Sequence, residues 1–231
     1  GVSLTIDKFA SGLNKLSHRG PDSLDIKAVN KNCLMGHTRL KILDLSDSAN
    51  QPFSYPQEDL HLVFNGQIYN YQDLKAKHQA SSCSPYRTTC DTESLYKELL
   101  ISGQKTVENL EGFWSFAVYN EKDNSLWASR DHFGVKQIYY HKSKTGDICI
   151  SSEIKAIHYL YPESKRININ YTRRYIARGW IDDTEETCFE DIFQLLPGSL
   201  MSIDGCKIES KRYWDVADFP FSRDKEYDTN I

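Results

Sequence analysis

The chain has 231 residues and a net charge of −4, from 28 Lys and Arg against 32 Asp and Glu. This acidic excess argues against a nucleic-acid partner, because phosphate contacts require clustered basic side chains. No segment approaches the ~20 consecutive apolar residues that span a bilayer, so we expect no membrane-spanning segment. A chain of this length is expected to form one large domain or two small ones.

Six cysteines are spread along the chain without a CxxC pair and without the Cys/His spacing of a zinc site. The chain is too long to need disulfides for stability. We therefore predict reduced thiols, a cytoplasmic protein and no metal site.

The predicted elements, in chain order, are mostly short strands. A strand over residues 1–5 is expected to precede a helix that Asp7 caps and that ends before residue 18. Further strands are predicted over residues 26–29, 33–40, 60–64, 113–119, 126–129, 137–141 and 148–152, and helices over residues 91–101, 153–159 and 171–177.

Two predicted strand pairs, 113–119 with 126–129 and 137–141 with 148–152, have the spacing of hairpins. A turn at Pro197–Gly198 is expected between two more short strands. Because strands and helices do not alternate, the pattern predicts an α+β fold with antiparallel sheets. The polar residues 215–231 are expected to form a linker or an edge.

Asn65–Gly66 follows a predicted strand and has two interpretations. Asn-Gly is the strongest short signal for a type I′ hairpin turn. Alternatively, the Asn amide and the Gly backbone N–H can stabilise a developing negative oxygen, as in an oxyanion hole.

Two charged residues also allow a structural and a functional interpretation. Arg39 can be an edge arginine paired with a nearby acid, or its planar fork can hold a substrate carboxylate. Asp91 stands where a helix begins, so it can be an N-cap or can bind the ammonium group of an amino acid. Arg130–Asp131 is expected to form a turn with a local ion pair.

The nucleotide-binding and hydrolase motifs that can be recognised from sequence are missing. The chain contains no GxGxxG run, no Walker A loop and no GxSxG elbow. The histidines at positions 18, 37, 132 and 158 have no Ser or Cys at catalytic spacing, so we expect structural roles for them.

The order of the longer motifs is specific, and the chain resembles the class II glutamine amidotransferases through them. These motifs are His18-Arg19-Gly20-Pro21-Asp22, His37-Thr38-Arg39-Leu40-Lys41-Ile42-Leu43-Asp44, Phe64-Asn65-Gly66-Gln67-Ile68-Tyr69-Asn70, Cys90-Asp91-Thr92-Glu93, Leu110-Glu111-Gly112, the run from Arg130-Asp131 to Tyr140, Ser152-Glu153-Ile154-Lys155-Ala156 and Leu196-Pro197-Gly198. Together they are similar to the amino-terminal domain of the asparagine synthetase B type over residues 1–214.

This resemblance implies the Ntn-hydrolase fold, a four-layer αββα sandwich of two antiparallel sheets. It implies hydrolysis of L-glutamine to glutamate and ammonia by an N-terminal cysteine whose own α-amino group is the base. That amine titrates near pH ~8 when unperturbed, so it can accept a proton near neutrality. The cysteine is expected directly before Gly1, and none of the six cysteines in the sequence can replace it.

The same resemblance assigns roles to residues of the pocket. Arg39 should hold the substrate carboxylate, Asp91 its ammonium, and Asn65 with Gly66 the oxyanion. The backbone near two further residues, Ile42 and Leu43, should line the pocket. Gln67 and Gln137 depart from the family pattern, where Glu and Pro are usual, and the change at Gln67 bears on glutamine affinity.

Beyond residue 214, the resemblance implies a linker, residues 215–231, toward an ATP-dependent synthetase domain that the sequence does not contain. ATP and magnesium are expected in that domain, and no cofactor in this one. Its carboxylate acceptor is aspartate by default, with a sugar acid or another acid possible, and a homodimer is possible. The alternative is a catalytically inactive, glutaminase-like scaffold or interaction domain.

Overall fold

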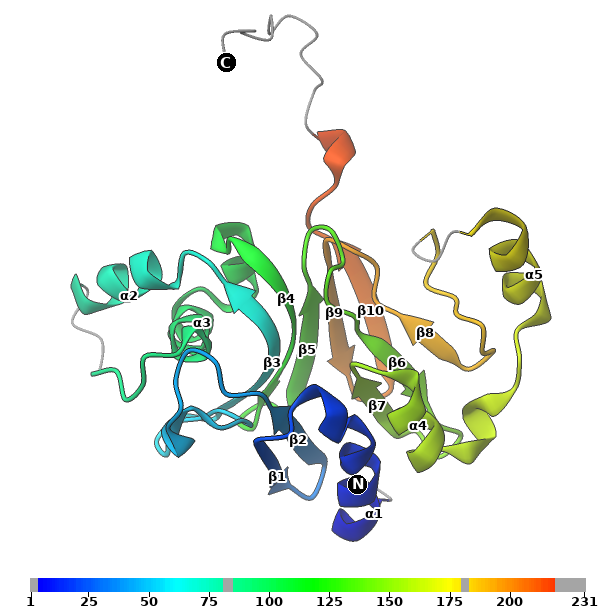
Figure 1. Cartoon of the computed structure of the whole chain (residues 1–231), viewed down its shortest axis with the longest axis horizontal. Coiled ribbons are helices and arrows are strands. Elements are labelled where there is room, and N and C mark those ends of the chain that lie inside the picture. The colour runs from blue at the N-terminus through cyan, green and yellow to red at the C-terminus, as the bar shows by residue number, and fades with distance from the viewer. Residues whose placement is uncertain (1–3, 81–84, 180–182, 219–231) are drawn as a thin grey trace, which may run out of the picture.

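The computed structural model describes residues 4–80, 85–179 and 183–218. Within these ranges the strands form three sheets, of two, five and three strands, and every strand pair is antiparallel. Helices lie on both outer sides of the sheets (Figure 1).

The five-stranded sheet is the centre of the fold, with the strand order β10-β9-β5-β4-β3. Its strands are β3 (Leu60–Ile68), β4 (Gly112–Asn120), β5 (Ser125–Arg130), β9 (Ser199–Asp204) and β10 (Lys207–Arg212). The apolar run in β4 is explained by burial of both faces of this strand. The predicted hairpin of β4 with β5 is confirmed.

The two smaller sheets contain the remaining strands. Strand β1 (Ser23–Asn30) pairs with β2 (Cys33–Arg39). Strand β6 (Tyr139–Lys142) pairs with β7 (Ile148–Ser151) and with β8 (Ile192–Gln194). The second predicted hairpin, now β6–β7, is therefore confirmed as well.

Five α-helices and several 3₁₀ segments complete the described part of the chain. The helices are α1 (Ile6–Leu13), α2 (Tyr71–Ala80), α3 (Asp91–Ser102), α4 (Ile154–Leu160) and α5 (Ile169–Arg178). The 3₁₀ segments are Asn14–Arg19, Asp47–Ala49, Gly103–Asn109, Pro162–Lys165 and Val216–Asp218.

Two apolar cores separate the layers. One lies between the large sheet and α3, and it includes Phe64, Trp114 and Leu95. The other lies between the large sheet and the three-stranded sheet, and it includes Met201 and Tyr140. Helices α1 and α4 pack on the small sheets, on the side away from α2 and α3 (Figure 1). The predicted α+β sandwich is confirmed, although its second sheet layer consists of two small sheets in the described residues.

Several element predictions need correction. The cap of α1 is Thr5 rather than Asp7, because the Thr5 side chain accepts from the backbone N–H of Lys8. Leu4 and Thr5 are not in a strand, and residues 1–3 of that predicted strand lie outside the described ranges. The chain stays helical through Arg19, in the 3₁₀ segment. Helix α2 and strand β10 were not predicted.

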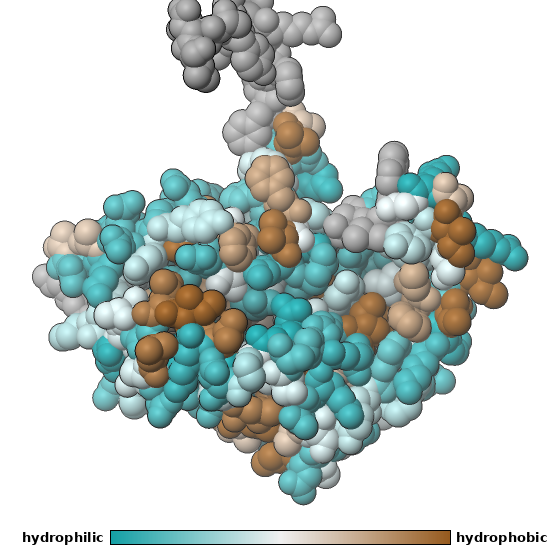
Figure 2. Space-filling view, viewed as in Figure 1, coloured by the Kyte–Doolittle hydropathy of each residue, from teal (hydrophilic) through white to brown (hydrophobic). Residues whose placement is uncertain are grey.

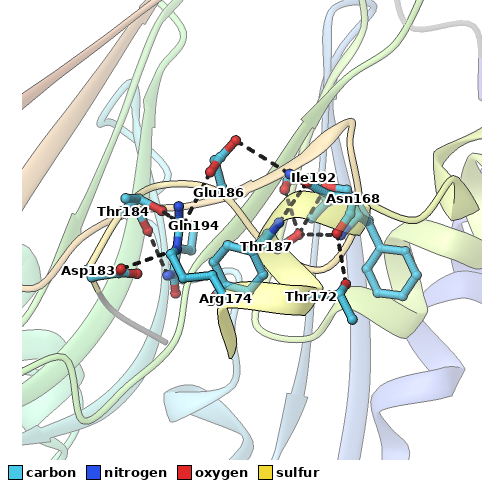
Figure 3. A network of polar contacts seen from close by, with 11 residues as sticks. Asn168, Thr172, Arg174, Asp183, Thr184, Glu186, Thr187, Ile192 and Gln194 are labelled. Atoms are coloured by element: carbon cyan, nitrogen blue, oxygen red, sulfur yellow. Dashed lines mark hydrogen bonds and ion pairs between the residues drawn. The ribbon is translucent and has the colours of Figure 1, made fainter. Parts of the chain in front are cut away.

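The α5 region is attached to the three-stranded sheet by a polar network (Figure 3). Asn168 caps the helix by accepting from the N–H of Tyr171 at 3.0 Å. Arg174 forms ion pairs with Asp183 and Glu186 at 3.4 and 3.3 Å. Tyr171 is the buried residue of this helix, so polar contacts rather than apolar burial secure it.

The face seen in Figure 2 is mostly hydrophilic, with apolar side chains gathered in separate patches. None of the described helices is long and apolar enough to cross a membrane. Across the described ranges, no group of three or more His, Cys, Asp or Glu side chains is arranged to hold a metal ion. The described cysteines are free thiols, and Cys83 lies outside the described ranges.

Candidate active site

A cavity of about 1260 Å³ lies between the sheet layers and opens to the surface. Its wall includes every residue predicted for the glutamine pocket: Arg39, Ile42, Leu43, Asn65, Gly66, Gln67 and Asp91. These residues come from β2, β3, the start of α3 and the loop after β2. The fold therefore brings together residues that lie up to 52 positions apart in the sequence, from Arg39 to Asp91.

Asn65 and Gly66 do not form a hairpin turn, because they lie inside β3 opposite Ser115 and Trp114 of β4. The buried Nδ2 atom of Asn65 has no hydrogen-bond partner in the described part of the chain. A buried donor without a partner is costly, and such groups commonly serve a functional purpose. The Asn65 amide is therefore available to an oxygen that enters the cavity.

Gly66 is required by close packing. A Cβ atom at this position would lie 2.2 Å from the Phe113 carbonyl oxygen and 2.8 Å from the Trp114 Cα. These contacts are with backbone, which cannot move aside as a flexible side chain does. Only glycine fits at position 66, and Asn65 is the residue directly before it in β3.

The peptide before Asn65 is fixed by two side chains that the sequence analysis did not single out for this role. The Gln51 side chain bonds both the N–H and the carbonyl oxygen of Phe64, at 2.6 and 3.1 Å. His37 donates from Nε2 to the same carbonyl at 3.1 Å. Burial lowers the pKa of His37 to about 4. A neutral His37 and Gln51 thus hold the backbone that carries Asn65.

Asp91 begins α3, but it is not the N-cap, since Cys90 occupies that position. Its Oδ2 accepts from the backbone N–H of Ile68 at 3.0 Å, and its Oδ1 accepts from the Cys90 thiol at 3.3 Å. Burial raises the pKa of Asp91, because desolvation outweighs these hydrogen bonds. Among the described residues no Lys, Arg or His forms an ion pair with this carboxylate, so it can accept an ammonium group from a ligand.

Arg39 ends β2 and is 5% exposed. Its Nη1 donates to the Ser46 carbonyl and to Asn50 Oδ1, both at 2.8 Å, and its Nη2 donates to the Asp44 carbonyl. The Nε–H and the second Nη2 hydrogen have no acceptor in the described ranges. The guanidinium therefore keeps two donors for a ligand, and its planar fork suits a carboxylate held through two bonds.

The remaining predicted residues lie at the edge of the cavity. Ile42 and Leu43 belong to the loop after β2 and expose 74% and 40% of their surface. Gln67 is exposed on β3 and lines the same wall. Gln137, the other departure from the family pattern, carries a buried Oε1 without a partner among the described residues.

A charged cluster stands beside the opening, where His18 and Arg19 line the cavity. Both donate to Glu153 Oε1, at 2.9 and 3.0 Å, and Lys155 pairs with Oε2 at 3.0 Å. This cluster joins the 3₁₀ segment after α1 to α4. It explains why His18-Arg19 and Glu153–Lys155 both belong to the ordered motifs, although they are far apart in sequence.

The turn predicted at Arg130–Asp131 is present. The fully buried Arg130 donates to the backbone carbonyls of Lys136, Leu195 and Gly134. Asp131 accepts from the backbone N–H groups of Phe133, Val135 and Lys136. These hydrogen bonds to the backbone hold the turn, and the predicted local ion pair stays a prediction.

The helix–sheet–sheet–helix order and the antiparallel strands define an Ntn-hydrolase sandwich. The same fold is found in glutamine phosphoribosylpyrophosphate amidotransferase of B. subtilis, with a TM-score of 0.64, 19% identity, 88% of this chain covered and 45% of that chain. The chain belongs to the glutamine amidotransferase domain family, whose sequence profile matches residues 3–214.

Curated relatives support the same family. Asparagine synthetase [glutamine-hydrolyzing] 3 of Bacillus subtilis is 30% identical over 92% of this chain and 34% of its own length. Amidase chry2 of Gibberella zeae is 30% identical over 98% of this chain and 33% of its own length. The chain spans less than half the length of these relatives.

Proposed function

We propose that this domain hydrolyses glutamine to glutamate and ammonia, and that the ammonia amidates a carboxylate in an ATP-dependent step. The observation that carries the first part is the buried, unpartnered Asn65 Nδ2 in the same cavity as Asp91 and the two remaining donors of Arg39. An acceptor for ammonium, a donor pair for a carboxylate and a donor for an amide oxygen match the polar groups of glutamine.

Binding of glutamine uses the two charged residues of the cavity, Arg39 and Asp91. The Nε–H and Nη2–H of Arg39 hold the α-carboxylate, and the carboxylate of Asp91 holds the α-ammonium. The side-chain carbonyl of glutamine then points toward Asn65 and Gly66. These donors stabilise the oxygen as negative charge develops on it, which is worth most in a water-poor site.

The nucleophile implied by the resemblance is a cysteine directly before Gly1. Its thiol proton passes to its own α-amino group, and the thiolate attacks the amide carbon. The C–N bond breaks, and ammonia leaves with the proton from the α-ammonium group. Water then gives a proton to the amine and adds to the thioester, the C–S bond breaks, and glutamate is released. Leu4, the first described residue, lines the same cavity and supports this arrangement.

The second part of the proposal concerns the fate of ammonia. The B. subtilis relative is named an asparagine synthetase, which makes aspartate the default acceptor. The G. zeae relative is named an amidase, so other carboxylates also fit the proposal. ATP and magnesium belong to a synthetase domain reached through residues 215–231. The cytoplasmic location and the homodimer stay predictions.

Calorimetry with L-glutamine and an assay of glutamate release test the proposal on the full-length protein. We expect glutamine to bind and glutamate to form. Binding without glutamate release would support the inactive scaffold instead. Absence of glutamine binding would exclude both the enzyme and a scaffold that senses glutamine. In the same protein, release of pyrophosphate that requires aspartate identifies the acceptor.

Arg39→Ala should weaken glutamine binding by about 100-fold or more, because a charge-assisted bidentate pair is lost. Its bonds to the Asp44 and Ser46 carbonyls are lost as well. Arg87→Ala is the control, since Arg87 is exposed and stacks on Tyr55 away from the cavity wall. Equal affinity in the parent and in Arg39→Ala would mean that another group holds the carboxylate.

A further inference from the structure

The loop between β2 and the 3₁₀ segment at residue 47 is held without burial of its apolar side chains. Leu40, Ile42 and Leu45 expose 53%, 74% and 71% of their surface. An exposed loop of this kind has little apolar packing to order it, so polar contacts must do so. Its conformation matters because Ile42 and Leu43 line the glutamine cavity.

The backbone N–H of Lys41 donates to Asp22, and the carboxylate of Asp44 supplies four further contacts in two directions. Within the loop, Oδ1 accepts from the backbone N–H of Ser46 at 2.8 Å and from its hydroxyl at 2.6 Å. Toward the segment before α3, Oδ2 accepts from the backbone N–H of Thr89 at 2.8 Å and from its hydroxyl at 3.1 Å. The Ser46 hydroxyl and the Thr89 N–H hold the pKa of Asp44 well below its usual value.

The two segments that Asp44 joins carry the two charged residues of the pocket. On one side, Arg39 donates to the Asp44 and Ser46 carbonyls, so the loop backbone orients the guanidinium. On the other side, Thr89 precedes Asp91 by two residues at the start of α3. One carboxylate therefore connects the group that holds the α-carboxylate of glutamine with the group that holds its α-ammonium.

We propose that Asp44 is a positioning residue for the amino-acid head group of glutamine. It ties the loop 40–46 to the segment before α3, and this tie sets the distance between Arg39 and Asp91. Asp44 touches neither the scissile amide nor the oxyanion donors. The inference rests on the proposed function, and it adds a residue that governs affinity for glutamine rather than the chemical step.

Asp44→Asn tests the proposal, because an amide keeps one acceptor but presents an N–H₂ group to the other pair of donors. Loss of two charge-assisted bonds should weaken glutamine binding by about tenfold or more. The KM should rise by a similar factor while kcat at saturating glutamine stays within about twofold, because only binding is affected. Asp47→Asn is the control, an exposed carboxylate that begins the adjacent 3₁₀ segment and pairs with Lys41 at 2.7 Å.

Thr89→Val provides a second, milder variant that keeps the side-chain shape and removes one hydroxyl donor. It should weaken glutamine binding less than Asp44→Asn does. Thr89→Ser keeps the hydroxyl and should therefore bind glutamine with the parent affinity. The melting temperature of each variant shows whether the fold is intact. A fall in kcat without a change in KM would overturn the positioning role.

Amide hydrogen exchange tests the tie without glutamine. The N–H groups of Ser46 and Thr89 should exchange at least about tenfold faster in Asp44→Asn, since each loses its carboxylate partner. Unchanged exchange at both amides would overturn the tie itself. Faster exchange with parent-like glutamine affinity would overturn the positioning role. If the parent itself bound no glutamine, the proposed function would fail and this role with it.

Discussion

At the scale of single residues, the site contains buried polar groups whose hydrogen-bonding and ion-pairing capacity the described residues fill only in part. Asn65 Nδ2 is buried without a partner, and Asp91 is a buried carboxylate whose pKa is raised by desolvation. Each costs stability in the empty protein. Under the proposed function, glutamine offers an oxygen to the first group and an ammonium to the second, and its binding recovers part of that cost.

Asn65→Ala should lower kcat by about 10²–10³ and change KM little, because the amide donor acts mainly on the transition state. A glutaminase assay over a range of glutamine concentrations measures both constants. Asn65→Asp keeps the shape but has no N–H donor, so it should lose as much activity. A parent-like kcat in both variants would show that Asn65 does not serve the oxyanion.

The sequence supplied the residues of the pocket but not all of their local roles. The local signal at Asn65–Gly66 favours a turn, and the local signal at Asp91 also fits an N-cap. Tertiary contacts set the actual places of these residues: β3 pairs with β4, and the backbone N–H of Ile68 donates to Asp91. Gln51 has no local signal at all, because its side chain acts as a hydrogen-bonding partner for a distant strand.

At the scale of elements, the loop between β5 and β6 is built around one carboxylate. Asp131 is 1% exposed and accepts from three backbone N–H groups at 2.9–3.1 Å. The loop also brings Lys136 to the wall of the cavity. Its conformation thus depends on a buried side chain rather than on turn propensity.

Asp131→Ala should destabilise the protein by about 2 kcal/mol or more, because it leaves several backbone donors without their acceptor. Urea unfolding followed by circular dichroism measures the free energy of unfolding. Asp123→Ala is the control in an exposed turn, where the carboxylate accepts from the N–H of Ser125 at 2.9 Å. A loss no larger than that of the control would contradict the role of Asp131.

Most strands and four of the five described helices were predicted from apolar patterning, with ends displaced by a few residues. Helix α2 was not, because Leu74 and His78 are its buried residues and its apolar pattern is therefore weak. It packs on α3, where His78 pairs with the buried Glu98 at 2.8 Å. This helix is specified by a polar contact with another helix, and the apolar pattern of its own residues does not reveal that contact.

At the scale of the whole molecule, histidines that are wholly or partly buried link stability to pH. Burial lowers the pKa of His37 to about 4, and it also lowers the pKa of His61, His132 and His158. The unfolded chain then binds more protons than the folded one at mildly acidic pH. Stability is full above the unfolded value near 6.5 and falls as pH drops toward the folded value.

For His37 alone, this linkage should remove about 3 kcal/mol of stability between pH 6.5 and pH 4. His37→Gln should show a shallower loss over that range in urea unfolding at a series of pH values. Above pH 7 the two profiles should run parallel, since His37 is neutral in both states there. Identical slopes below pH 6.5 would mean that His37 does not contribute to acid lability.

The way in which α5 is attached affects which part of the molecule unfolds first. The ion pairs of Arg174 with Asp183 and Glu186 lie near the surface, where dissolved salt screens charges. The aromatic core around Trp114 is insensitive to such screening. Rising ionic strength therefore favours detachment of α5 as a separate unit, well before the cooperative unfolding of the sandwich.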